Sequence, residues 1–88
     1  MKTAFHASFL RDVKKLRDAK VRRAVGAAIS NVEQAHSIDQ IRGVKRLSGQ
    51  GEHYRIRIGD WRIGLIIRGN VVSFVCCLNR REVYRYFP

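Results

Sequence analysis

The stretch that decides the fold is Tyr54–Arg62, which reads YRIRIGDWR. It predicts two strands joined by a two-residue turn at Gly59-Asp60. Such a turn fixes the register of the two strands, so the residues that face each other can be written down from the sequence. The predicted cross-strand pairs are Ile58–Trp61, Arg57–Arg62, Ile56–Ile63, Arg55–Gly64 and Tyr54–Leu65.

The second of these pairs places Arg57 directly opposite Arg62. Like charges in that position destabilise a sheet, so stability alone does not explain the pair. Guanidinium groups match the geometry of phosphate oxygens and stay charged at any relevant pH. We therefore interpret the pair as a phosphate-sized cationic site. The alternative is that the alternating arginines of this strand form only a solvated outer face.

A second tight turn, Gly69-Asn70, joins the predicted strands Trp61–Arg68 and Val71–Asn79. The pairs that it predicts are Arg68–Val71, Ile66–Ser73, Gly64–Val75 and Arg62–Cys77.

The two registers divide the side chains of the sheet into two faces. One face is almost entirely apolar and must be covered, most simply by helices; it carries Tyr54, Ile56, Ile58, Trp61, Ile63, Leu65, Ile67, Val72, Phe74, Cys76 and Leu78. The other face is basic and carries Arg55, Arg57, Arg62, Gly64, Ser73, Val75, Cys77 and Asn79. Because Gly64 has no side chain, the basic face has room for something to lie across the sheet.

The N-terminal half predicts a short strand at residues 1–7 and then two helices. Apolar residues recur at helical spacing in two series, Phe9, Val13 and Leu16, and then Val21, Val25, Ala28, Ile29 and Val32. The step of five residues between the series rotates the apolar face, which favours two helices over one. Ser8 and Asp18 are the predicted N-caps. A connector at 37–43, a strand at 44–47 and a loop at 48–52 follow.

These elements predict one α+β domain over residues 1–88. Two N-terminal helices pack on a small, mainly antiparallel twisted sheet of about four strands, and a short element ends the chain. Cys76 and Cys77 are neighbours in a strand and point to opposite faces, so we interpret them as ordinary strand residues.

The charge balance favours a polyanionic partner. Lys and Arg number 18 against 7 for Asp and Glu, which gives a net charge of +11. Nucleic acid is the first candidate, an acidic protein the second and anionic membrane the last. The chain has no apolar run of ~18 residues and no signal peptide, so we expect a cytosolic protein. It also lacks a phosphate-binding glycine loop and metal-ligand spacing, so we expect no metal and no small-molecule cofactor.

The C-terminal residues 80–88 begin at the edge of the basic face. Tyr84 follows Arg81 by three residues, so one helical turn brings the two together, and its ring can stack on a base or handle a proton. In the alternative, the tail aromatics form an apolar latch on the domain, which is the preferred interpretation for Tyr86 and Phe87. His53, at the start of the hairpin, is a candidate general base, although a solvated strand-end histidine is the simpler interpretation.

The hairpin Tyr54–Ile63 followed by the tail Arg80–Arg85 (RREVYR) resembles the RelE/ParE toxin superfamily, and most closely the RelE-type messenger-RNA interferases. The order of elements is also similar over nearly the full chain. The hairpin and the tail together are a fairly specific signature, whereas either alone is weak.

The resemblance implies a toxin of a type II toxin–antitoxin pair that cuts messenger RNA in the ribosomal A site without a metal. The 2′-hydroxyl attacks the adjacent phosphate and leaves a cyclic phosphate and a free 5′-hydroxyl. The residues that it implies as catalytic are Arg57, Arg62, Arg80 and Tyr84, and those that bind RNA phosphate are Arg55, Arg81 and Lys45. Spacing in the tail varies, so Arg81 is the alternative to Arg80.

One position departs from the family pattern. Many relatives have a histidine immediately before the tail arginines, where this chain has Asn79. Asparagine cannot act as a general base, so proton abstraction falls to Tyr84, to a perturbed basic group or to no residue. Fixed guanidinium groups can still stabilise the phosphorane transition state more than the ground state.

The expected partners are a cognate acidic antitoxin, which covers the basic face or displaces the C-terminal element, and messenger RNA on the ribosome. Two other functions remain open. One is a ParE-like inhibitor of DNA gyrase that cuts nothing itself; the Arg80–Tyr84 motif favours the nuclease over it, because ParE-like members generally lack that catalytic set. The other is a basic RNA-binding module that has lost its catalysis, which Asn79 would explain.

Overall fold

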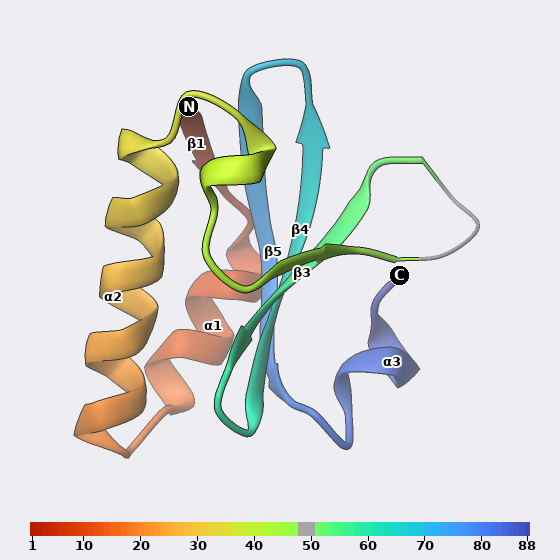
Figure 1. Cartoon of the computed structure of the whole chain (residues 1–88). Helices are drawn as coiled ribbons and strands as arrows, with labels where there is room; N and C mark the ends of the chain where they lie inside the picture. The colour runs from red at the N-terminus through yellow and green to blue at the C-terminus, as the bar shows by residue number, and fades with distance from the viewer. Residues whose placement is uncertain (48–50) are drawn as a thin grey trace.

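A computed structural model of the chain describes residues 1–47 and 51–88. The elements in chain order are β1 (Lys2–Phe5), α1 (Ala7–Lys15), α2 (Ala19–Gln34), a single 3-10 turn η1 (Ile38–Gln40), β2 (Val44–Arg46), β3 (His53–Ile58), β4 (Trp61–Arg68), β5 (Val71–Asn79) and α3 (Val83–Tyr86) (Figure 1). Most of the predicted loop at 48–52 lies outside the described residues, and its last two positions form a turn before β3.

The strands form one sheet in the order β1-β5-β4-β3-β2, in which β1 runs parallel to β5 and the other neighbours are antiparallel. Helices α1 and α2 cover one face, and the short α3 lies on the opposite face (Figure 1). The predicted α+β class is therefore confirmed. The sheet has five strands instead of about four, because β1 and the short β2 both pair with it.

The two predicted helices are both present, and the break between them falls where the apolar series changes phase. Phe9 and Leu16 from the first series are buried. Asp18 caps α2 as predicted, since its Oδ1 accepts the Lys20 backbone N–H at 2.8 Å. The predicted cap at Ser8 is wrong: His6 is the N-cap residue of α1, and the Ser8 hydroxyl donates to the Val75 carbonyl of β5.

The β3–β4 hairpin has the predicted register at all five pairs. Gly59 has a φ of +55°, a conformation that glycine adopts at no steric cost, so the two-residue turn closes without strain. The local turn chemistry thus fixes the position of the arginines on this sheet.

The register between β4 and β5 differs from the prediction beyond Leu65. The pairs Arg68–Val71 and Ile66–Ser73 form as predicted, but a β-bulge leaves Val75 without a partner. Gly64 consequently faces Cys76 instead of Val75, and Arg62 faces Leu78 instead of Cys77. The extra residue of a bulge exchanges the two faces of the strand after it.

The bulge changes the composition of both faces. Cys77 belongs to the main core, whereas Cys76 and Leu78 belong to a smaller apolar cluster under α3, so their predicted faces are wrong. The two cysteines do point to opposite faces, as predicted. The main core between the sheet and the two long helices is otherwise the predicted apolar face; its buried members are Phe9, Leu16, Val25, Val32, Ala35, Ile41, Ile56, Ile63, Leu65, Ile67, Val72, Phe74 and Cys77.

None of the helices formed by the described residues has the length and apolar character needed to cross a membrane.

Candidate active site

The centre of the candidate site is the cross-strand pair Arg57–Arg62. The Arg57 backbone N–H donates to the Gly43 carbonyl at 3.1 Å, on the β2 side of its strand. Arg57 and Arg62 therefore form a non-hydrogen-bonded pair, in which the Cα atoms approach to about 4.5 Å and the side chains are close. Two guanidinium groups start from neighbouring points on the face opposite α1 and α2.

Arg62 and Arg80 both hold the Gly59-Asp60 turn. The Arg62 Nη1 donates to the Gly59 carbonyl at 2.7 Å and to the Trp61 carbonyl at 2.9 Å. The Arg80 backbone N–H donates to the Asp60 carbonyl at 2.7 Å, and its Nε lies 3.6 Å from the Asp60 carboxylate. The structure thus brings the predicted tail arginine to the end of the hairpin that carries the arginine pair.

Arg55 and Lys45 lie farther along the same face, on β3 and on the edge strand β2, where they are direct partners. The Arg55 Nη1 donates to the Gly43 carbonyl at 2.7 Å, which fixes the direction of its guanidinium group. Lys45 is exposed. These two predicted phosphate-binding residues extend the positive charge away from the hairpin turn.

Two residues that the sequence did not single out for positioning shape the tail. Asp60 binds Arg80 as described above. Asn79, which the sequence marks only as a missing histidine, accepts the Arg81 N–H on its Oδ1 at 3.1 Å and the Glu82 N–H on its backbone carbonyl at 2.9 Å. Asparagine favours such turns because its side chain mimics a backbone carbonyl. A register corrected for the bulge would have placed Asp60 beside Arg80.

The room left by Gly64 is not open for a ligand. Phe87 packs there, and its side chain is 3% exposed. The predicted apolar latch is thus confirmed for Phe87 and wrong for Tyr86, which is 70% exposed. The Phe87 and His53 rings pack edge-on, with their centroids 5.3 Å apart. His53 is therefore a half-buried packing residue and not a solvated strand-end histidine.

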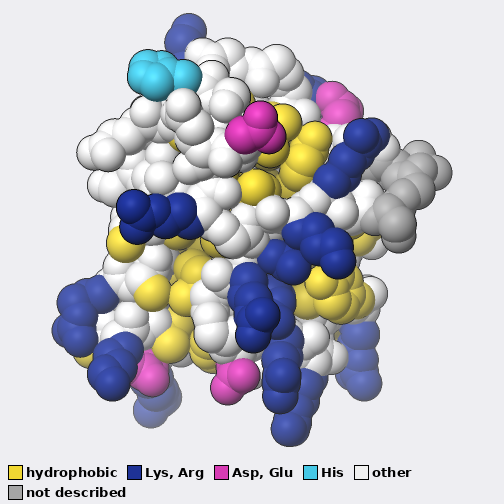
Figure 2. Space-filling view, viewed as in Figure 1, with side chains coloured by type: hydrophobic (Ala, Val, Ile, Leu, Met, Phe, Trp, Pro, Cys, Tyr) yellow, Lys and Arg dark blue, Asp and Glu magenta, His cyan; other side chains and the backbone are white. Residues whose placement is uncertain are grey.

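Tyr84 lies on α3 with its side chain 58% exposed. Within residues 1–47 and 51–88, its side chain makes no hydrogen bond or ring contact. The tail therefore presents its phenol to solvent on the same side of the sheet as the arginines. Figure 2 shows Lys and Arg side chains in a band that runs down this strand side of the molecule.

The two cysteines carry no chemistry at neutral pH. Burial is the main cause that raises the pKa of the Cys76 thiol to about 11 and that of the Cys77 thiol to about 12, and the nearby Asp12 carboxylate contributes to both increases. A thiol reacts as the thiolate, so both side chains act as small apolar groups.

Comparison with known proteins places this fold and tail in a family. Residues 4–84 match the family described as ParE toxin of type II toxin-antitoxin system, parDE. The chain is 30% identical over 89 residues to Toxin RelE3 of Methanocaldococcus jannaschii, and the alignment covers 100% of both proteins.

Solved structures agree with the sequence comparisons. The chain is similar to one in the RelB-RelE antitoxin-toxin complex from Methanococcus jannaschii, with a TM-score of 0.82, 28% identity and coverage of 97% and 99% of the two chains. It shares its fold with a chain of the intact E. coli RelBE toxin-antitoxin complex, with a TM-score of 0.70, 18% identity and coverage of 89% and 94%. The chain belongs to the RelE/ParE superfamily of type II toxins.

Proposed function

We propose that this toxin is an endoribonuclease that cuts messenger RNA in the ribosomal A site by attack of a 2′-hydroxyl on the adjacent phosphate. The observation that carries the proposal is the opposed pair Arg57–Arg62, with Arg80 held at the same hairpin turn. Because two opposed arginines destabilise the sheet, we infer that the pair is kept to bind an anion.

Each residue has a role in this reaction. Arg57, Arg62 and Arg80 surround the phosphate and stabilise the additional negative charge of the phosphorane. Because Asn79 cannot act as a base, Tyr84 in its phenolate form takes the proton from the 2′-hydroxyl as the 2′-oxygen bonds to phosphorus. The bond from phosphorus to the 5′-oxygen then breaks, and the leaving oxygen takes a proton from water. Arg55, Arg81 and Lys45 bind neighbouring phosphates. The products are a cyclic phosphate and a 5′-hydroxyl, and the chemistry takes place in the cytosol, where the ribosomes are.

The partner that restrains this activity is an acidic antitoxin. Relatives with the same fold were solved as RelB-RelE complexes, and the net charge of +11 favours an acidic partner. We expect the antitoxin to cover the arginine face or to displace α3. A complex that leaves both Arg57 and Arg62 open to solvent would contradict direct blocking of the site.

The test is cleavage on programmed ribosomes, with the 5′ ends of a defined messenger RNA mapped by primer extension. We expect new ends confined to the A-site codon, and a fall of about 10²–10³ in rate for Arg62→Ala while the variant remains folded. The matched control is Arg68→Ala on the same strand, which pairs with Glu52 far from the turn and should cut normally. Undiminished cleavage by folded Arg62→Ala would overturn the assignment.

A second function is favoured by the match to the ParE family. In that case the toxin inhibits DNA gyrase by binding and cuts no RNA. Intact messenger RNA in the ribosome assay together with inhibited supercoiling would indicate this function. Binding of RNA without either effect would indicate a module that has lost catalysis.

A further inference from the structure

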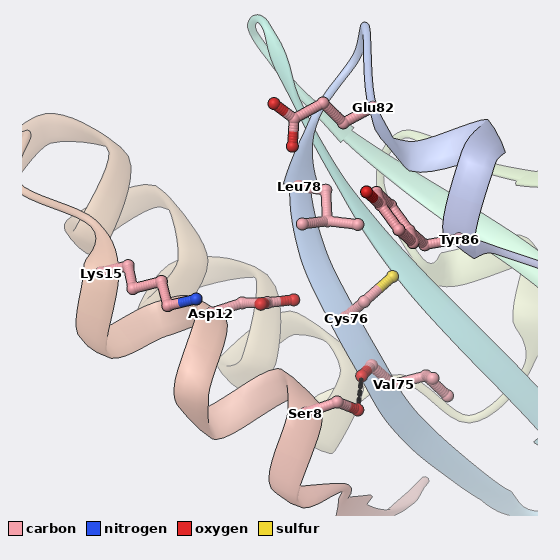
Figure 3. Close-up of a pocket in the computed structure, with 8 residues that line it drawn as sticks. All are labelled: Ser8, Asp12, Lys15, Val75, Cys76, Leu78, Glu82 and Tyr86. Atoms are coloured by element: carbon pink, nitrogen blue, oxygen red, sulfur yellow. Dashed lines mark hydrogen bonds between the residues drawn. The ribbon is translucent and has the colours of Figure 1, made fainter.

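A cleft between α1 and the C-terminal tail lies next to the arginine site, which is formed by Arg57, Arg62 and Arg80. None of these arginines lines the cleft. Its volume is about 380 Å³, at the lower end of the ~300–1,000 Å³ range of small-molecule sites. Asp12 and Lys15 point toward it from α1, Glu82 and Tyr86 from the tail, and Leu78 of β5 lies between them (Figure 3).

The cleft is next to the arginine site in two ways. Leu78 is the direct cross-strand partner of Arg62, so the cleft begins one strand away from the arginine pair. Glu82 also lines a second hollow of about 350 Å³, together with Asp60, Arg80 and Arg81. A nucleotide chain with one phosphate at Arg62 and Arg80 therefore has its neighbouring base at the cleft.

The side chains around the cleft suit a flat ring that carries hydrogen-bond donors. Tyr86 is 70% exposed and offers a face on which a base can stack, opposite the apolar Leu78. Lys15 supplies a cation for a phosphate. Asp12 is fixed because its Oδ2 accepts the Cys77 N–H at 2.9 Å, and the Glu82 carboxylate makes no hydrogen bond or ion pair among the described residues.

The acids are the informative part of the cleft. The chain has only 7 Asp and Glu against 18 Lys and Arg, and two of the acids lie here beside the arginine site. A carboxylate weakens phosphate binding but accepts hydrogen bonds from the amino groups of bases. Adenine, cytosine and guanine carry an exocyclic amino group. Uracil lacks such an amino group, and its one ring donor, N3–H, lies between two carbonyl oxygens that repel a carboxylate.

We propose that this cleft holds the base next to the cleaved phosphodiester and selects adenine, cytosine or guanine over uracil. Glu82 is the residue that discriminates, and Tyr86 is the stacking platform. The choice of RNA as the ligand rests on the proposed function, whereas the binding preference is measurable without any cleavage.

The test uses 2′-O-methyl RNA hexamers, which lack the attacking hydroxyl, and the ¹⁵N-labelled full chain. One hexamer is all uridine, and three others carry a single A, C or G at the third position. We expect amide shifts at residues 12–15 and 78–82, with at least about fivefold weaker binding of the all-uridine hexamer. Equal affinity for all four hexamers, or shifts that leave both segments unchanged, would overturn the proposal.

Two variants and a control make the test sharper. Glu82→Gln presents an amide that both donates and accepts, so binding of the all-uridine hexamer should rise and the preference should disappear. Tyr86→Ala should weaken all four hexamers by about tenfold. Glu33→Gln removes an exposed carboxylate at the far end of α2 and should keep the preference. A preference that survives Glu82→Gln would contradict the role of this residue. Because the hexamers cannot be cut, failure here and failure in the ribosome assay are separate results.

Discussion

The ring of Phe87 occupies the volume that a side chain at Gly64 would fill. A Cβ atom at that position would lie 2.8 Å from the Phe87 ring and 2.7 Å from the Cys76 Sγ. The absence of a side chain at Gly64 thus lets Phe87 pack against β4, and this contact, together with the buried Val83, holds the C-terminal helix α3 on the sheet. The tail that carries the predicted catalytic residues is attached to the sheet through this contact.

Replacement of Gly64 by alanine should loosen this attachment. The added methyl group must displace Phe87 or Cys76, and overpacking of this kind costs about 1–3 kcal/mol in the free energy of unfolding. Urea denaturation measures the loss. Gly26→Ala is the matched control: it lies in α2 with no atom within 4 Å of the new Cβ, and it should gain up to about 1 kcal/mol. Equal stability of Gly64→Ala and the parent would show that Phe87 and Cys76 can make room for the methyl group without cost.

Replacement of Arg57 by threonine should raise stability while it lowers cleavage. The change removes the repulsion across the Arg57–Arg62 pair, which is worth roughly 0.2–1 kcal/mol. The gain should shrink at high salt, because salt screens exposed charges. Denaturation at low and high sodium chloride measures both effects. Arg46→Thr, opposite Tyr54, controls for the strand propensity of threonine. A loss of stability in Arg57→Thr at low salt would contradict the repulsion.

Replacement of Asn79 by alanine should release the turn that begins the tail. The Arg81 N–H then loses its acceptor, and a hydrogen bond of this kind is worth about 0.5–1.5 kcal/mol. We expect hydrogen exchange of the Arg81 amide to rise by roughly tenfold. Asn79→Asp keeps an acceptor oxygen and should exchange like the parent. If both variants exchange at the parental rate, the side chain of Asn79 does not hold the turn.

The two cysteines should make the protein less stable at alkaline pH. Their thiols have a pKa of about 11 and about 12 in the fold against 9.0 for a free thiol. Below pH 9 the thiols are neutral in both states and cost nothing. Between pH 9 and the folded pKa values the unfolded chain ionises first, so stability falls as pH rises, by up to ~1.4 kcal/mol per unit for each thiol.

Denaturation curves between pH 8 and pH 10.5 measure this slope. Other groups titrate in the same range, so the comparison is with Cys76→Ala and Cys77→Ala, each of which should flatten the slope. An unchanged slope in both variants would show that the thiols are not the cause.

The sequence predicts what short-range chemistry determines. The Gly59-Asp60 turn closes between directly adjacent strands, so the pairs from Ile58–Trp61 to Tyr54–Leu65 follow from it without knowledge of the rest of the chain. The cap at Asp18 is equally local, since it binds an N–H only two residues away.

The errors lie where distant packing decides. The bulge at Val75 lies directly after the last residue of β5 that pairs with β1. At this point α1 contacts β5: Ser8 donates a hydrogen bond to the Val75 carbonyl and Asp12 accepts the Cys77 N–H, over sequence separations of 67 and 65 residues. No local pattern marks the bulge, and the faces of Cys76, Cys77 and Leu78 change with it. The room at Gly64 follows from the missing side chain, but the sequence did not predict that Phe87 of the C-terminal tail fills it.

The candidate site shows the same division. Arg55, Arg57 and Arg62 were placed by the hairpin register. The position of Arg80 beside the turn depends on Asp60, and that contact needed the corrected β5 register. The sequence alone could therefore name the arginines but not their mutual arrangement.

The parallel pairing of β1 with β5 has a consequence for synthesis of the toxin. The partners of Lys2–Phe5 in β1 are Val71–Phe74 in β5, so the strand that is synthesised first can pair only after the last strand has been synthesised. Contacts so distant in sequence form late, because a long loop must close first. The arginines of β3 and β4 are synthesised before β5, the strand that pairs with β4. Arg80, whose backbone N–H donates to the Asp60 carbonyl, is synthesised later still. A chain that ends before β5 therefore carries Arg57 and Arg62 but lacks the parallel pairing with β1 that completes the sheet.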